Sequence, residues 1–137
     1  MAWTYDKLKV GDKDSITKKI TGDVINAFAD VSNDTNPVHL DEAFAKTTQF
    51  GKRIAHGMIA AGLISAVFGS KFPGPGTIYL SQTLKFKRPV FIDDTLTAWV
   101  EITEKNDEKK RLIARTWVEN QNGEPVVDGE GQVLFPL

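Results

Sequence analysis

The stretch GMIAAGLISAVFG, residues 57–69, contains no charged side chain and is apolar at most positions. A segment that is apolar on all sides is typical of a helix buried inside a globular domain, and this one is shorter than the about 20 residues that cross a bilayer. We therefore expect a central helix from Gly57 to Gly69 with every face buried. The rest of the fold is expected to form around it.

Strand patterns follow the central helix. The segment FPGPG, residues 72–76, predicts a loop. Four strands are expected after it, at residues 77–86, 95–103, 112–118 and 126–135. Turn-forming residues separate the last three strands, which predicts an antiparallel meander. Long strands gathered after one buried helix predict an α+β domain in which a curved antiparallel sheet wraps the helix.

The segment before the central helix is predicted to hold two helices and one strand. Residues 21–32 have helical periodicity, with Thr21 as the cap and an apolar stripe of Val24, Ile25, Phe28 and Ala29. Asp41 is expected to cap a short helix over residues 41–45. Residues 14–20 predict a short strand at the edge of the sheet.

Length, charge and composition limit the class of protein. The chain has 137 residues and a mass of 15.2 kDa, which predicts a single domain over residues 1–137 with a proper core. A formal net charge of -1 disfavours nucleic acids and membranes as partners. The absence of cysteine excludes disulfides, thiolate metal sites and a cysteine nucleophile. The first residues lack the apolar run of a signal peptide, so a cytoplasmic location is expected.

The segment DTNPVHLD, residues 34–41, combines two carboxylates, an amide, a proline and one of the two histidines. Pro37 has no backbone N–H and moves Asn36 out of the helical region, so a turn separates Asp34 from His39. A histidine titrates near neutral pH, and a carboxylate beside it can orient it or share a water molecule with it. We expect Asp34 and His39 to act together in general acid–base chemistry.

The second histidine, His56, directly precedes Gly57 at the predicted start of the central helix. We expect His56 to support the loop through a hydrogen bond rather than to take part in chemistry. A metal site made from His39, His56 and nearby acids is disfavoured, because the spacing gives no pair of ligands on one helix face.

A longer motif extends these residues. It reads Asp34-x-Asn36-Pro37-x-His39-x-Asp41, followed by HGM at 56–58, IYL at 78–80 and FKRPV at 86–90. In this motif the sequence resembles the (R)-specific enoyl-CoA hydratases, the hydratase-2 or MaoC-like branch of the hot-dog fold. The resemblance covers nearly the whole chain, from residue 21 to residue 136.

The resemblance implies a single hot-dog domain that forms a homodimer or a higher homo-oligomer. It implies a hydro-lyase that hydrates a trans-2-enoyl-CoA reversibly and with syn geometry to the (3R)-3-hydroxyacyl-CoA, with Asp34 and His39 as the catalytic pair. The Gly57 N–H is implied to bind the thioester oxygen, and Ser65 to lie near the site. No metal or redox cofactor is implied, since coenzyme A is part of the substrate.

The chemistry of the residues agrees with these roles. Addition of water to carbon 3 gives the thioester oxygen enolate character, and a glycine N–H at a helix N-terminus can approach and stabilise it. Asn36 is a further candidate for substrate binding, and it also favours a turn. Phe68 is expected either to close the acyl pocket and select short chains or to be a core residue. Candidates for binding the phosphates of coenzyme A are Lys52, Arg53, Lys85, Lys87 and Arg88.

Two other functions stay open. The nearest is a hot-dog thioesterase or a dehydratase acting on acyl-carrier protein. Several such enzymes carry the catalytic carboxylate on the central helix, whereas residues 58–70 contain no Asp or Glu. The second is a non-catalytic acyl-thioester binding module, which would need the apolar pocket but not both Asp34 and His39.

Overall fold

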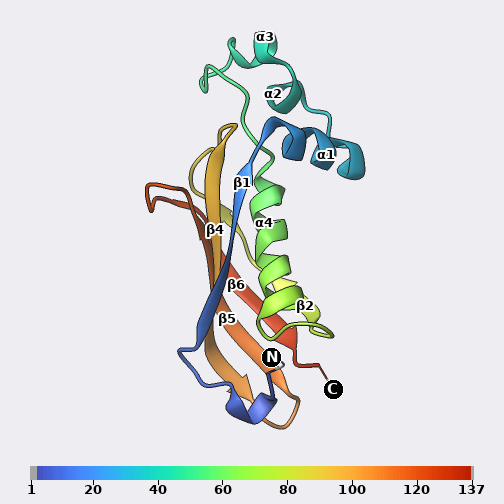
Figure 1. Cartoon of the computed structure of the whole chain (residues 1–137), viewed down its shortest axis with the longest axis vertical. Helices are drawn as coiled ribbons and strands as arrows, with labels where there is room; N and C mark the ends of the chain where they lie inside the picture. Colours follow the sequence, from blue (N-terminus) through green and yellow to red (C-terminus); the bar gives the residue numbers. More distant parts are fainter. Residues whose placement is uncertain (1–2, 137) are drawn as a thin grey trace.

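The computed structural model describes residues 3–136 and contains a six-stranded antiparallel sheet with a helix lying along it. Three further helices lie beyond one end of that helix (Figure 1). The strand order is β1-β4-β5-β6-β2, and β3 also pairs with β6. The strands are β1 (Lys13–Ile20), β2 (Ile78–Gln82), β3 (Lys85–Phe86), β4 (Asp94–Asn106), β5 (Arg111–Glu119) and β6 (Pro125–Leu134).

The predicted antiparallel meander is confirmed, since β4, β5 and β6 pair in sequence order. The predicted edge strand near residues 14–20 is confirmed as β1, which pairs with β4 alone. The prediction of one continuous strand over residues 77–86 is wrong, because this segment forms two strands, the first of which has a register shift. A Cβ atom on Gly129 would collide with the Thr83 carbonyl, so the irregular segment between β2 and β3 crosses β6 where β6 has no side chain.

The helices before the central helix follow the predicted capping. In α1 (Gly22–Ser32) the Thr21 hydroxyl accepts a hydrogen bond from the Val24 N–H at 3.2 Å. Asp41 caps α3 (Glu42–Ala45) by accepting from the Phe44 N–H. A helix that was not predicted, α2 (Pro37–Leu40), is a single turn that begins at the proline. A 3-10 turn, η1 (Tyr5–Lys7), precedes β1.

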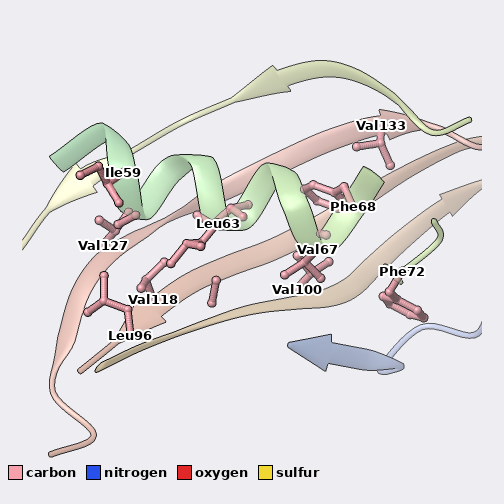
Figure 2. Packing of buried hydrophobic residues seen from close by; sticks show 14 of the residues in the cluster. Ile59, Leu63, Val67, Phe68, Phe72, Leu96, Val100, Val118, Val127 and Val133 are labelled. Atoms are coloured by element: carbon pink, nitrogen blue, oxygen red, sulfur yellow. The ribbon is translucent and has the colours of Figure 1, made fainter. Parts of the chain in front are cut away.

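The central helix consists of α4 (Gly57–Ala66), which continues as one turn of π-helix, η2 (Val67–Lys71). Its buried side chains point toward the sheet, where they meet apolar residues of β4, β5 and β6 (Figure 2). The labelled contacts include Ile59, Leu63, Val67 and Phe68 on the helix side and Leu96, Val100, Val118 and Val127 on the sheet side. The hydrophobic core of the domain therefore lies between the central helix and the sheet.

The prediction that every face of the central helix is buried is wrong for a single chain. Met58 is 52% exposed, and Gly62 and Ser65, which follow it at helical spacing, are exposed as well. The sheet covers only one side of the helix, so an uncharged stripe faces outward. No helix within residues 3–136 has the length and apolar character needed to cross a bilayer.

Candidate active site

The connection between α1 and α4 carries both predicted catalytic residues. The α1 helix ends at Asn33, which adopts a left-handed conformation with a φ of 63°. Asp34 follows, and its Oδ1 accepts a hydrogen bond from the Asn36 N–H at 3.3 Å. Asn36 in turn caps α2, since its Oδ1 accepts from the Val38 N–H at 3.1 Å. These local bonds fix the turn that joins Asp34 to His39, and they confirm a structural role for Asn36.

The fold brings Asp34, His39 and His56 together. One side-chain oxygen or nitrogen from each lies within 4.8 Å of the others. Asp34 is exposed, whereas both histidines are buried. The two imidazole rings stack with their centroids 3.9 Å apart and their planes 30° apart. The predicted pair of Asp34 and His39 is therefore joined by a third polar residue, His56, whose ring lies against that of His39.

The hydrogen bonding of His39 defines which nitrogen is available for chemistry. Its Nδ1 lies 2.7 Å from the Ile54 carbonyl oxygen. A carbonyl can only accept, so Nδ1 carries the proton and the lone pair of the neutral ring is on Nε2. Burial lowers the pKa of His39; the hydrogen bond to Ile54 and the charge of Asp34 oppose this, and His56 adds to it. His39 is thus disposed to be a neutral base.

Arg53 ties the loop to α1. Its Nε donates to the His39 carbonyl oxygen at 2.6 Å, and its Nη2 donates to Asn26 Oδ1 at 3.1 Å. These bonds use two donors of a residue that was a candidate for phosphate binding. They favour a role in holding His39 in place, which the sequence analysis missed, because a contact between residues 14 positions apart leaves no periodic pattern.

The Gly57 N–H is the first of α4, and no hydrogen bond among the described residues uses it. His56 occupies the cap position, yet its side chain makes no capping bond. A Cβ atom on Gly57 would lie 2.6 Å from Cε1 of Phe86, so the Phe86 ring fills the space beside this glycine. A free N–H at the positive end of a helix is suited to binding a developing oxyanion.

Gly57 and His39 line a common cavity of about 450 Å³, a volume typical of small-molecule sites. Most of the other lining residues are apolar, among them Phe50, Ile54, Met58, Phe86 and Val127. Lys87 and Arg88 are exposed residues that also line it. The cavity therefore joins a base, a free N–H donor, an apolar surface and positive charge.

Asp34 and Asn36 are not among the described residues that line the cavity, although Asp34 lies beside His39, and two further predicted site residues lie elsewhere. Ser65 is exposed on α4, about 12 Å along the helix axis from Gly57 at the usual helical rise. Phe68 is buried in the core with its ring 5.3 Å from that of Tyr79. Within residues 3–136, neither lines the cavity. Their roles in substrate binding stay predictions.

Asp34, His39 and His56 are also a possible set of metal ligands. The argument from sequence against a metal site considered only ligand pairs on one helix face, whereas these three residues meet only in the fold. Two of the four imidazole nitrogens are engaged with backbone carbonyls, His39 Nδ1 with Ile54 and His56 Nε2 with Asp34. One nitrogen on each ring and the exposed Asp34 carboxylate stay available to an ion, which is fewer than the four protein ligands of a closed structural zinc site. These three residues therefore do not form such a site by themselves.

Comparison with known proteins supports the resemblance. A family model described as a MaoC-like domain matches residues 9–122. The chain belongs to the MaoC-like family. It is 48% identical to an (R)-specific enoyl-CoA hydratase of Rhodospirillum rubrum over 96% of this chain and 91% of that protein. It is 45% identical to a 3-hydroxybutyryl-CoA dehydratase of Methylorubrum extorquens over 96% of this chain and 83% of that protein.

Among solved structures, the R-hydratase PhaJ1 of Pseudomonas aeruginosa in its unliganded form is similar to this MaoC-like chain. It superposes with a TM-score of 0.92 and 51% sequence identity, covering 96% of this chain and 84% of the other. The predicted hot-dog fold, with an antiparallel sheet around a central helix, is thereby confirmed.

Proposed function

We propose that the protein is an (R)-specific enoyl-CoA hydratase, a hydro-lyase that reversibly adds water to short trans-2-enoyl-CoA thioesters. The observation that carries this is the common cavity of His39 and Gly57, with a base on one side and a free N–H on the other. Relatives named as an enoyl-CoA hydratase and as a dehydratase of a four-carbon thioester support the reaction and the short chain.

In the proposed reaction, Asp34 and His39 hold the attacking water. Nε2 of neutral His39 accepts a proton as the water oxygen bonds to carbon 3, and the thioester carbonyl becomes an enolate. The Gly57 N–H stabilises the enolate oxygen, with help from the α4 dipole. The pair then returns the proton to carbon 2. Oxygen and proton arrive from the same side of the substrate, so the addition is syn.

The proposed reaction uses no redox cofactor, because the proton moves between water, His39 and carbon 2 without any change of oxidation state, and it uses no metal, because the Gly57 N–H stabilises the thioester oxygen. Coenzyme A enters as part of the substrate. Lys87 and Arg88 line the cavity and are placed to meet its phosphates, although Arg88 also pairs with Glu124 at 3.2 Å. Lys52 and Lys85 are exposed and remain further candidates.

We also propose that two copies of the chain form a homodimer. The support is a set of exposed apolar side chains, Met58 on α4 and Ile78, Tyr79 and Leu80 on the edge strand β2. The mass measured by light scattering should be about twice 15.2 kDa. Leu80→Glu should shift it to the monomer mass, whereas Val31→Glu, at an exposed apolar position on α1, should not.

Hydration of crotonyl-CoA tests the function directly. Loss of the enoyl-thioester absorbance should be accompanied by a product that an (R)-specific 3-hydroxyacyl-CoA dehydrogenase oxidises, and a chelator should leave the rate unchanged. Release of free thiol instead would indicate a thioesterase. Binding without any reaction would indicate an acyl-thioester binding module, and either result would overturn the proposal.

A further inference from the structure

His56 contacts each part of the candidate active site. Its Nε2 lies 2.9 Å from the backbone oxygen of Asp34. Its ring stacks on that of His39 at 3.9 Å. It is also the residue directly before Gly57, at the cap of α4. One side chain thus links the carboxylate-bearing loop, the base and the start of the helix whose N–H is free.

The His56 ring is held from two sides. Phe28 of α1 contacts it with a centroid distance of 4.8 Å, and His39 lies against it at 3.9 Å. His56 is only 3% exposed. The stack therefore limits the motion of the His39 ring, which the bond from its Nδ1 to Ile54 already anchors at one edge.

Of the two ring nitrogens of His56, one makes a hydrogen bond to the backbone and the other is buried without a partner among the described residues. Because a carbonyl oxygen only accepts, Nε2 donates its proton to Asp34, and a neutral ring then has its lone pair on Nδ1. That Nδ1 is buried and has no hydrogen-bond partner within residues 3–136. A buried polar atom without a partner disfavours folding, so packing alone would be served better by a phenylalanine. The hydrogen bond to Asp34 is the feature that a phenylalanine would lack.

His56 does not act on the substrate directly. Among the described residues, His39 and Gly57 line the cavity, whereas Asp34 and His56 do not; Asp34 is exposed, but His56 is only 3% exposed and lies behind the His39 ring. Its side chain is directed to the Asp34 carbonyl and makes no capping bond to the first turn of α4. A serine or aspartate at this position would bind the first-turn N–H groups instead.

We propose that His56 is a positioning residue for the hydration reaction: it holds Asp34 and His39 at the correct distance and orientation relative to the free N–H of Gly57. The proposal rests on the proposed function, and it adds a residue that acts through the catalytic pair and never touches the thioester. A loss of this residue should therefore lower the turnover number and leave substrate binding nearly unchanged.

Two substitutions separate the hydrogen bond from the packing. His56→Phe keeps a ring between Phe28 and His39 and removes both the donor and the unpartnered nitrogen. His56→Gln can place an amide N–H where Nε2 was, but it lacks the ring. Each variant is assayed for kcat and KM with crotonyl-CoA and for its melting temperature. Phe72→Leu, a change in the core at the far end of the central helix, shows what a loss of stability alone does to kcat.

We expect His56→Phe to melt no lower than the wild type, to lose at least tenfold in kcat and to change KM by less than threefold. His56→Gln should recover part of the lost kcat despite a lower melting temperature, and Phe72→Leu should lower the melting temperature only. A wild-type kcat in His56→Phe would overturn the proposal. So would a failure of both His56 variants to fold, or a loss of kcat that follows the melting temperature in all variants. A wild type without hydratase activity would instead overturn the proposed function.

Discussion

The two ends of the uncharged central helix differ in their surroundings: the start borders a cavity, and the other end is packed in the core. At the start of α4, the Gly57 N–H is free, His39 is buried with an open Nε2, and a cavity of about 450 Å³ lies alongside. At the other end, Phe68 and Phe72 are almost fully buried, and a Cβ on Gly131 would lie 3.0 Å from the Phe68 ring. At the start, the Gly57 N–H and the His39 Nε2 have no hydrogen-bond partner among the described residues, whereas the other end is closely packed.

This difference teaches that the function of a residue in the helix depends on which end it occupies. A Cβ atom on Gly57 would meet the Phe86 ring, and one on Gly131 would meet the Phe68 ring and, closer still, Oε1 of Gln82. Beside Gly57 the ring belongs to the exposed Phe86 and borders the cavity, whereas beside Gly131 it belongs to the core. Substitutions at the start of α4 should therefore change activity, and substitutions at its end should change stability.

The largest effect is expected for the catalytic pair. Asp34→Asn and His39→Ala should each lower kcat for crotonyl-CoA hydration by about 10² to 10⁴ fold, because each removes one member of the acid–base pair. The exposed Asp34 should leave the melting temperature nearly unchanged when it is replaced. Asp30→Asn, at an exposed position on α1, is the control and should retain wild-type activity. Retained activity in both pair variants would contradict the assignment.

Gly57→Ala should have the next largest effect. The new methyl group would meet the Phe86 ring at 2.6 Å and disturb the oxyanion donor, which lowers kcat by about 10² to 10³ fold if the donor is lost. Gly22→Ala, on the first turn of α1, meets no described atom within 4 Å and should be neutral. A partial recovery in Gly57→Ala/Phe86→Leu would identify the clash as the cause.

Phe68→Ala should act on stability. Removal of a buried phenylalanine costs about 3 to 5 kcal/mol of unfolding free energy, measured by urea denaturation, whereas Phe44→Ala at an exposed position should cost about 0.5 kcal/mol or less. Activity on crotonyl-CoA should persist where the variant is folded. If Phe68 also limits chain length, the variant will gain activity on longer enoyl-CoA substrates; unchanged long-chain activity would remove that role.

The smallest effect is the pH dependence of His39. Because its pKa is lowered in the folded protein, the neutral base persists below pH 6.5, and the acid limb of kcat/KM should lie below that value. The unfolded chain takes up the proton first, so stability should fall as the pH drops through about 6.5, and less so in His39→Gln. An acid limb above pH 6.5 would contradict this.

The sequence predicted the meander and the α1 cap because alternation, turn residues and a threonine before a helical stripe are local signals. It also predicted Asp34 and His39 through a compact motif. It did not predict the contacts of Arg53 with Asn26 and His39, the stack of His39 on His56 or the place of Phe86, because each joins segments that only the fold brings together. The exposed face of α4 was missed because hydropathy does not distinguish a core from a surface that another chain could cover.

The position of β1 at the edge of the sheet has a consequence for the order of folding. Thr17 of β1 bonds to Thr97 of β4, 80 positions along the chain, whereas β4, β5 and β6 pair with their sequence neighbours. Contacts that close long loops form late, because the entropy of loop closure must be lost first. The segment that carries Asp34, His39 and His56 lies within that loop. In a refolding experiment, the stacked Trp99 and Trp117 of β4 and β5 should therefore report a structured sheet before catalytic activity returns.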